Sequence, residues 1–240
     1  PGRISGDRLM LELQNIDVAY GKAKILHGFS LTAMPGEILC LLGRNGAGKT
    51  TTMKAIMGLL PLKAGSIVLD GEDLSGLAAH EVPRRGIGYI PQGRRLFAEL
   101  TVAENIEIGL MARNKGAETR ERVLDIFPRL RERLDQAAET LSGGEQQMLA
   151  IGRALMTNPK LLILDEATEG LAPLVRDDIW ACLSALKKDG QSILVIDKNV
   201  RALTEIADRH YLIEKGQVVW TGTSAELSAN EEIQHKYLGV

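Results

Sequence analysis

The sequence predicts an α/β fold with a mostly parallel sheet, an N-terminal antiparallel β subdomain and an inserted α-helical subdomain. Continuous apolar runs predict the parallel sheet, because strands buried on both faces have this pattern; the runs are Ile38–Leu42, Leu161–Leu164 and Ile193–Ile196. Apolar and polar residues alternate over 11–20 and 25–33, with Gly21 between the two runs, which predicts an antiparallel pair. From about 92 to 140 the strand patterns stop, which indicates a helical insert.

Turn and capping residues place further elements. A third strand of the antiparallel subdomain is predicted at 67–69, since the turn pair Asp70-Gly71 follows it. In the insert, residues 101–104 read Thr-Val-Ala-Glu, a capping box that opens a helix toward Arg113.

Three elements are predicted after these. An amphipathic helix covers 118–127 and is broken by Pro128. Near the C-terminus, residues 211–213 and 218–220 form a hairpin around a Gly-containing turn. A last helix is predicted over 225–238.

The composition is that of an ordinary globular protein. With 240 residues, 45% of them hydrophobic, the chain can bury a sizeable core, which excludes disordered and fibrous architectures. The net charge of −2 argues against nucleic acid as a partner, because nucleic-acid-binding domains are usually basic. The two cysteines, Cys40 and Cys182, are too few for a disulfide framework and favour a reducing cytosol. No apolar run approaches the roughly 18 residues of a membrane span, and we expect one domain over 9–240.

A phosphate-binding loop follows the first parallel strand. Residues 43–50 match the pattern G-x-x-x-x-G-K-[ST], and a helix can begin at Thr51. The glycines let backbone N–H groups surround an oxyanion, and the helix N-terminus adds a positive dipole. Lys49 would reach the terminal phosphates, and the Thr50 hydroxyl would ligate Mg²⁺. The predicted nucleotide-binding residues of this P-loop NTPase core are Gly43, Arg44, Asn45, Gly46, Ala47, Gly48, Lys49, Thr50 and Thr51.

Two adjacent carboxylates end the second parallel strand, at the edge where parallel sheets place functional groups. Asp165 is predicted to hold Mg²⁺, and Glu166 to orient and polarise an attacking water. Alone, this pattern is more typical of a strand that ends in an acidic turn. Together with the phosphate loop it predicts a nucleoside triphosphatase.

A third motif, at residues 141–147, reads Leu-Ser-Gly-Gly-Glu-Gln-Gln. It resembles the signature of ATP-binding cassette (ABC) proteins, in which a Ser hydroxyl and Gly N–H groups at a helix N-terminus form a second anion site. The resemblance extends from about Leu11 to Leu238 and implies an ABC ATPase with ATP and Mg²⁺ as cofactors. The residues that it implies for the second anion site are Ser142, Gly143, Gly144 and Glu145.

The resemblance also assigns single positions. Tyr20 matches the aromatic residue that stacks on adenine, and Gln92 matches a glutamine that contacts Mg²⁺ or water and relays to a membrane subunit. The segment 169–172 matches the one that crosses between two nucleotide-binding subunits. The implied division is a catalytic core over 9–91 and 141–240 and a helical subdomain over 92–140.

Three positions depart from the family pattern. Ala167 replaces the usual Pro after the catalytic Glu, and Ala172 stands where Asp is common. Lys198 stands where a switch histidine normally falls. Its ammonium group can reach a γ-phosphate as a point charge, but it lacks the flat geometry of imidazole. Lys198 is therefore a candidate catalytic residue, with a plain solvent-exposed side chain as the alternative.

Several segments are most similar to the shorter ATP-binding subunit of bacterial branched-chain amino-acid importers: 93–97, 100–105, 127–130, 170–173 and 237–239. Urea and amide importers are an alternative, and so is a catalytically weak, nucleotide-sensing partner in a heterodimer. A soluble cassette ATPase that acts on DNA or ribosomes is disfavoured, because 240 residues leave no room for two cassettes or long coiled-coil insertions.

The implied partners are a second cassette and integral membrane permease subunits. The family's phosphate loop and signature face opposite ways, so a complete site implies a head-to-tail homo- or heterodimer. The resemblance also implies a location: the chain would be cytoplasmic and peripheral on the inner face of the cell membrane. Four arginines are candidates either for docking a permease helix or for a solvated basic face: Arg84, Arg85, Arg94 and Arg95.

Overall fold

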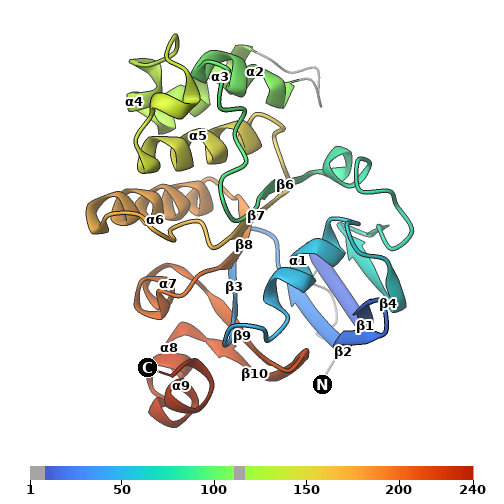
Figure 1. Cartoon of the computed structure of the whole chain (residues 1–240). Coiled ribbons are helices and arrows are strands. Elements are labelled where there is room, and N and C mark those ends of the chain that lie inside the picture. The colour runs from blue at the N-terminus through green and yellow to red at the C-terminus, as the bar shows by residue number, and fades with distance from the viewer. Residues whose placement is uncertain (1–8, 111–116, 240) are drawn as a thin grey trace.

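The computed structural model describes residues 9–110 and 117–239, and a six-stranded sheet lies at its centre (Figure 1). Its strand order is β10-β9-β3-β8-β7-β6, parallel throughout except for the β9–β10 hairpin. Every residue of β3, β7 and β8 is buried, which confirms the predicted parallel sheet. The strands are β3 (Ile38–Leu42), β6 (Ile87–Ile90), β7 (Leu161–Asp165), β8 (Ser192–Ile196), β9 (Arg209–Glu214) and β10 (Gln217–Thr223).

A second, four-stranded sheet is antiparallel and has the order β2-β1-β4-β5. This confirms the predicted N-terminal antiparallel subdomain. The sheet is made by β1 (Leu11–Tyr20), β2 (Ala23–Ala33), β4 (Leu62–Leu69) and β5 (Glu72–Asp73).

Hydrophobic cores cover both faces of the parallel sheet. Because side chains alternate along a strand, Leu39 and Leu41 of β3 enter the core that lies between the two sheets, whereas Cys40 enters the core on the opposite face. Helix α1 (Lys49–Ile56) contributes the fully buried Met53 and Ile56 to the core between the sheets. The 43–50 loop, which joins β3 to α1, is therefore held by packed elements at both ends.

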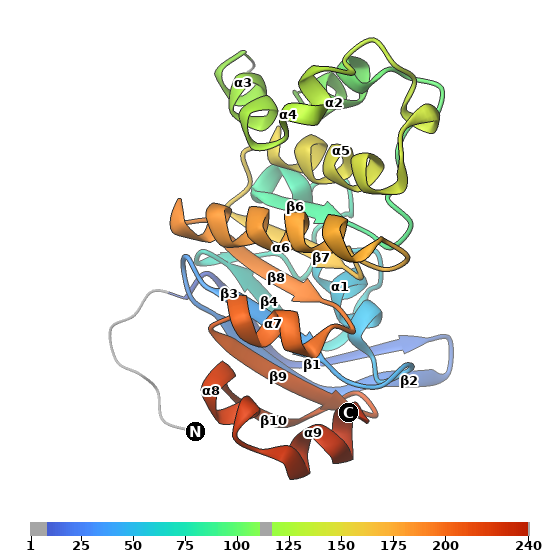
Figure 2. The ribbon, with the colours of Figure 1, turned by 90° about the vertical axis from the view of Figure 1, so that its left-hand side faces the viewer.

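The other helices lie at both ends of the sheet and over one of its faces (Figure 2). Helices α2 to α5 group beyond β6, α6 and α7 contact β8 and β3, and α8 and α9 lie beside β9 and β10. None of the helices in 9–110 and 117–239 is long and apolar enough to span a bilayer. They are α2 (Val102–Leu110), α3 (Ala117–Ile126), α4 (Pro128–Arg131), α5 (Gly143–Leu155), α6 (Pro173–Lys188), α7 (Val200–Ile206), α8 (Ser224–Ser228) and α9 (Glu231–Leu238), with 3₁₀ turns η1 (Val82–Arg85) and η2 (Ala138–Thr140).

Some predicted helix limits were wrong. The predicted single helix over 225–238 is two helices, because Asn230 caps α9 by accepting a hydrogen bond from the Ile233 N–H group. Pro128 ends one helix but also begins another, since proline fits the first turn of a helix. The helix predicted to run from 101 toward Arg113 is described as far as Leu110, and Arg113 lies outside the described residues.

The turn of the β9–β10 hairpin supports the 43–50 loop. The Gly216 N–H group donates to the Ala47 carbonyl at 2.8 Å, and the Gly216 carbonyl accepts from the His27 N–H group at 3.0 Å. Gly216 has a φ of 76°, and a Cβ atom there would overlap with the Ile25 carbonyl. Glycine is therefore required where the hairpin holds the loop.

We expect Gly216→Ala to lower the free energy of unfolding by about 3 kcal/mol or more, because a left-handed φ and a steric overlap both oppose the new methyl group. Gly71→Ala is the matched control: Gly71 also ends a hairpin turn, with a φ of 84°, but nothing lies within 4 Å of its Cβ position. That variant should lose only about 1 kcal/mol. Urea unfolding followed by circular dichroism measures both variants, and equal losses would contradict the overlap argument.

Candidate active site

The ends of four neighbouring strands bring the predicted site residues together. The 43–50 loop follows β3, Asp165 and Glu166 end β7, Lys198 follows β8, and Gln92 follows β6. Part of the 43–50 loop, Gln92, Glu166 and Lys198 line one cavity of about 390 Å³, and Asp165 lies beside Thr50 of that lining. Its lining residues are Ile25, Asn45, Gly46, Gly48, Lys49, Thr50, Thr51, Gln92, Glu166 and Lys198.

The 43–50 loop has the geometry of an anion cradle. Gly48 has a φ of 117°, and a Cβ atom there would lie 2.8 Å from a Leu26 methyl carbon, so a larger residue would disturb the start of α1. The Lys49 ammonium group donates to the Gly43 carbonyl at 2.7 Å and to the Arg44 carbonyl at 3.1 Å. Lys49 is 7% exposed, and burial lowers its pKa against the opposing effect of Glu166 and Asp165. The positive charge is thus held inside the loop, where an anion can replace the carbonyl partners.

Asp165 lies beside Thr50, which lines the cavity. The Thr50 hydroxyl donates to Asp165 Oδ1 at 3.5 Å, while Asp165 Oδ2 is buried without a hydrogen-bond partner among the described residues. Burial raises the pKa of Asp165, and the Thr50 hydrogen bond opposes this effect. A buried carboxylate oxygen without a partner beside a hydroxyl suits a hard cation such as Mg²⁺. The residues present therefore fit the predicted metal.

Glu166 is held at the end of β7 in a left-handed conformation, with a φ of 53°. Its N–H group donates to the Ile196 carbonyl at 2.8 Å, and its Oε2 atom accepts from Gln92 Nε2 at 3.0 Å. Burial raises the pKa of the Glu166 carboxyl, and the Lys198 ammonium group lowers it. The carboxylate is 12% exposed and lines the same cavity as Lys49.

Lys198 is exposed but not free. Its side chain is 54% exposed, and its Nζ atom lies 2.7 Å from Glu169 Oε1 and 3.5 Å from Glu166 Oε2. Glu169 also accepts a hydrogen bond of 2.6 Å from Gln92 Nε2. Hydrogen bonds from Lys198 and Gln92 lower the pKa of Glu169 to about 2. Sequence reasoning gave Glu169 no role of its own, since its contact with Lys198 joins residues 29 positions apart.

The 142–145 segment lies apart from the phosphate loop. Ser142 and Glu145 form a capping box at the start of α5, and the Glu145 carboxylate also accepts from Arg133 Nε at 2.7 Å. The Glu145 side chain therefore holds the helix start, and the Ser142 hydroxyl and the Gly143 and Gly144 N–H groups are the remaining donors of the predicted anion site. None of these residues lines the cavity at the phosphate loop.

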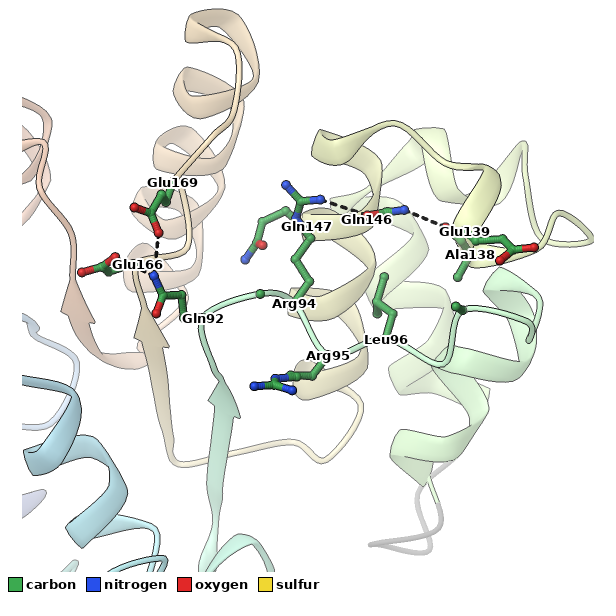
Figure 3. A pocket seen from close by; sticks show the side chains of 12 residues that line it. Gln92, Arg94, Arg95, Leu96, Ala138, Glu139, Gln146, Gln147, Glu166 and Glu169 are labelled. Atoms are coloured by element: carbon green, nitrogen blue, oxygen red, sulfur yellow. Dashed lines mark hydrogen bonds between the residues drawn. The ribbon is translucent and has the colours of Figure 1, made fainter. Parts of the chain in front are cut away.

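A second cavity, of about 670 Å³, lies beside α5 (Figure 3). Gln92, Glu166 and Glu169 line one end of it, and Gln146 and Gln147 of α5 line the other. Residues 92–98 connect the two ends. At the α5 end, Arg94 donates to Gln146 Oε1 at 2.9 Å. The remaining lining residues are Gly93, Arg94, Arg95, Leu96, Ala98, Ala138 and Glu139.

Tyr20 ends β1 and is 44% exposed. The Lys54 ammonium group of α1 lies 5.9 Å from the centre of its ring. The ring is thus available for stacking on the α1 side of the molecule, although Tyr20 does not line the 390 Å³ cavity.

Comparison with known proteins decides the family. A family model described as ABC transporter matches residues 26–169, which is more than half of the chain and includes the phosphate loop, the 142–145 segment and both strand-end carboxylates. The chain belongs to the ABC transporter family. As an ABC cassette it is an ATP-binding subunit and an ATPase.

Two curated relatives are similar to this ABC cassette along almost its whole length. The high-affinity branched-chain amino acid transport ATP-binding protein BraG of Pseudomonas aeruginosa is 42% identical over 96% of this chain and 100% of BraG. The lipopolysaccharide export system ATP-binding protein LptB of Escherichia coli is 37% identical over 95% of this chain and 97% of LptB. Branched-chain amino acid transport and lipopolysaccharide export systems therefore both occur among the relatives of this cassette.

Solved structures confirm the ABC ATPase fold. A nucleotide-free ATP-binding cassette from an ABC transporter has a TM-score of 0.84 at 27% identity and covers 94% of this chain and 97% of its own. A bacterial ABC transporter cassette with a dimeric structure has a TM-score of 0.80 at 26% identity and covers 90% of this chain and 99% of its own.

We expect Lys49→Ala to weaken ATP binding about 10- to 100-fold, because it removes charge-assisted hydrogen bonds from the cradle. Isothermal titration with ATP in the presence of EDTA measures the affinity without turnover. Lys63→Ala, an exposed lysine of β4, is the matched control and should leave the affinity unchanged. Full affinity in the Lys49 variant would remove Lys49 from the site.

Proposed function

We propose that this chain is the ATP-hydrolysing subunit of a bacterial importer for branched-chain amino acids. The observation that carries the proposal is the 42% identity to BraG over the full length of that protein. In this proposal the chain lies on the cytoplasmic face of the cell membrane, bound to integral permease subunits. Residues 9–91 and 141–240 form its catalytic core, and 92–140 form the helical subdomain.

The nucleotide is held by three groups of residues in this proposal. Lys49 and the N–H groups of 43–51 bind the phosphates, and the exposed Tyr20 ring stacks on adenine. Thr50, Asp165 and Gln92 hold Mg²⁺, which supplies charge neutralisation on the β- and γ-phosphate oxygens when bound. The support is the partnerless Asp165 oxygen beside the Thr50 hydroxyl.

Glu166 orients the attacking water and accepts its proton. Its carboxylate lies in the cavity of the phosphate loop, and burial raises its pKa, which suits a general base. Gln92 donates to that carboxylate and thereby fixes its direction. Lys198 lines the same cavity and supplies positive charge there, where it would face a γ-phosphate.

A second cassette completes the site. Ser142, Gly143 and Gly144 line neither of the two cavities that contain Glu166, which supports a role for these donors at the phosphate loop of another chain. In a head-to-tail pair they face the nucleotide of the other chain. The similarity to a cassette with a dimeric structure supports this arrangement. Closure of the pair on ATP and its release after hydrolysis would drive the permease.

We expect Glu166→Gln to lower ATP turnover by about 10²-fold or more while ATP affinity stays unchanged, because only proton acceptance is lost. A closed dimer should then accumulate with ATP, which size-exclusion chromatography measures. Glu132→Gln, at an exposed position after α4, is the control and should keep full turnover. Unchanged turnover in the Glu166 variant would contradict the role proposed for Glu166. If instead the unaltered chain binds ATP but does not hydrolyse it, a heterodimer with a more active partner is favoured.

Transport of lipopolysaccharide is the second candidate, because LptB is nearly as similar as BraG. Uptake of radiolabelled leucine by cells that lack this chain distinguishes the two. We expect uptake to fall at least about 10-fold, to return with the unaltered chain and not to return with Glu166→Gln. Normal leucine uptake together with impaired export of lipopolysaccharide to the cell surface would favour the second candidate. Loss of urea uptake alone would favour the related urea and amide importers.

A further inference from the structure

Glu169 contacts two side chains, Gln92 and Lys198, that also contact Glu166. Its two carboxylate oxygens accept from Lys198 Nζ at 2.7 Å and from Gln92 Nε2 at 2.6 Å. Both donors also contact Glu166, Gln92 at 3.0 Å and Lys198 at 3.5 Å. Figure 3 shows the Glu169 and Gln92 side chains directed toward each other beside Glu166.

The backbone next to Glu169 and Lys198 is held in place independently of their side chains. The Asp197 carboxylate accepts from the Thr168 hydroxyl at 2.6 Å and from the Thr168 N–H group at 3.2 Å, and its other oxygen accepts from the Asn199 N–H group at 3.0 Å. Asp197 is 8% exposed and Thr168 is 3% exposed. These bonds fix the backbone of the segments that carry Glu169 and Lys198. What can still vary is the direction of the two side chains.

A lysine at this position needs such a partner. Its four rotatable side-chain bonds give an exposed ammonium group many positions, and immobilising it has a large entropic cost. Imidazole is shorter and stiffer, so a histidine needs less support. The contact between the half-exposed Lys198 and Glu169 side chains contributes little to folding stability. Its consequence is instead that the ammonium group is held within 3.5 Å of Glu166, at the wall of the phosphate-loop cavity.

We propose that Glu169 is a positioning residue for ATP hydrolysis, which holds Lys198 beside Glu166 and so makes a lysine usable where the family normally has histidine. The inference rests on the proposed role of Glu166. It requires that the effect of Glu169 on turnover depend on the residue at position 198.

A double-mutant cycle on the purified full chain tests this requirement. Glu169→Ala should lower kcat by about 10-fold or more with the KM for ATP nearly unchanged, because a misplaced group affects the reacting geometry rather than nucleotide binding. In the Lys198→His background, the same substitution should change kcat less than 2-fold. Glu169→Asp should restore part of kcat, and the melting temperature should stay within a few degrees in all variants. Equal losses of kcat in the two backgrounds would overturn the proposal.

A labelling experiment tests the contact without turnover. N-hydroxysuccinimidyl acetate acetylates free lysines, and mass spectrometry of timed samples gives the rate at Lys198. We expect Glu169→Ala to raise that rate several-fold, while the rate at Lys188, an exposed lysine at the end of α6, stays constant. An unchanged rate at Lys198 would overturn the proposal. If the unaltered chain hydrolyses ATP and Glu166→Gln does so equally fast, the proposed role of Glu166 fails, and the labelling rate alone then decides whether Glu169 holds Lys198.

Discussion

The parallel pairing of β3, β8, β7 and β6 is the constraint on which the site depends. In this register Leu164 of β7 lies between Val195 of β8 and Ile90 of β6, so all these strands leave the sheet at one edge. The apolar strands provide the burial, and the polar residues that follow them meet in space although they are far apart in sequence. A one-residue slip of β7 would carry Asp165 away from Thr50 and turn Glu166 to the other face of the sheet.

Charge explains why this edge is ready for a polyphosphate and a cation. Three carboxylates, Asp165, Glu166 and Glu169, lie near the two ammonium groups of Lys49 and Lys198, which is an excess of one negative charge within this set. A bound triphosphate adds more negative charge, which the helix dipole of α1 offsets only in part. The excess favours a divalent cation at the oxygen that Asp165 leaves without a partner. Nucleotide and metal binding are therefore expected to depend on each other.

Local patterns predicted most of the fold, and contacts between distant segments account for the rest. The strand over 38–42 and the loop after it are specified by neighbouring residues, so they could be read directly. Strand β6 was not predicted, because Ile87–Ile90 is short and contains Gly88, and pairing with β7 is what makes it a strand. In the candidate site, the local motifs around Lys49 and Asp165 were enough to predict the residues there. The contact between Lys198 and Glu169 has no sequence pattern, because it depends on how two loops are tied together.

The segment that links the active edge to the helices is held in a strained form. Arg94 and Arg95 have φ values of 63° and 52°, a conformation that costs an arginine of the order of 1 kcal/mol. Contacts with α5 offset this cost: Arg94 donates to Gln146, and the Arg95 carbonyl accepts from Arg153 at 2.7 Å. Gln92 lies two residues before the strained pair and holds Glu166. The 92–95 segment therefore joins the contact with Glu166 at one end to two contacts with α5 at the other.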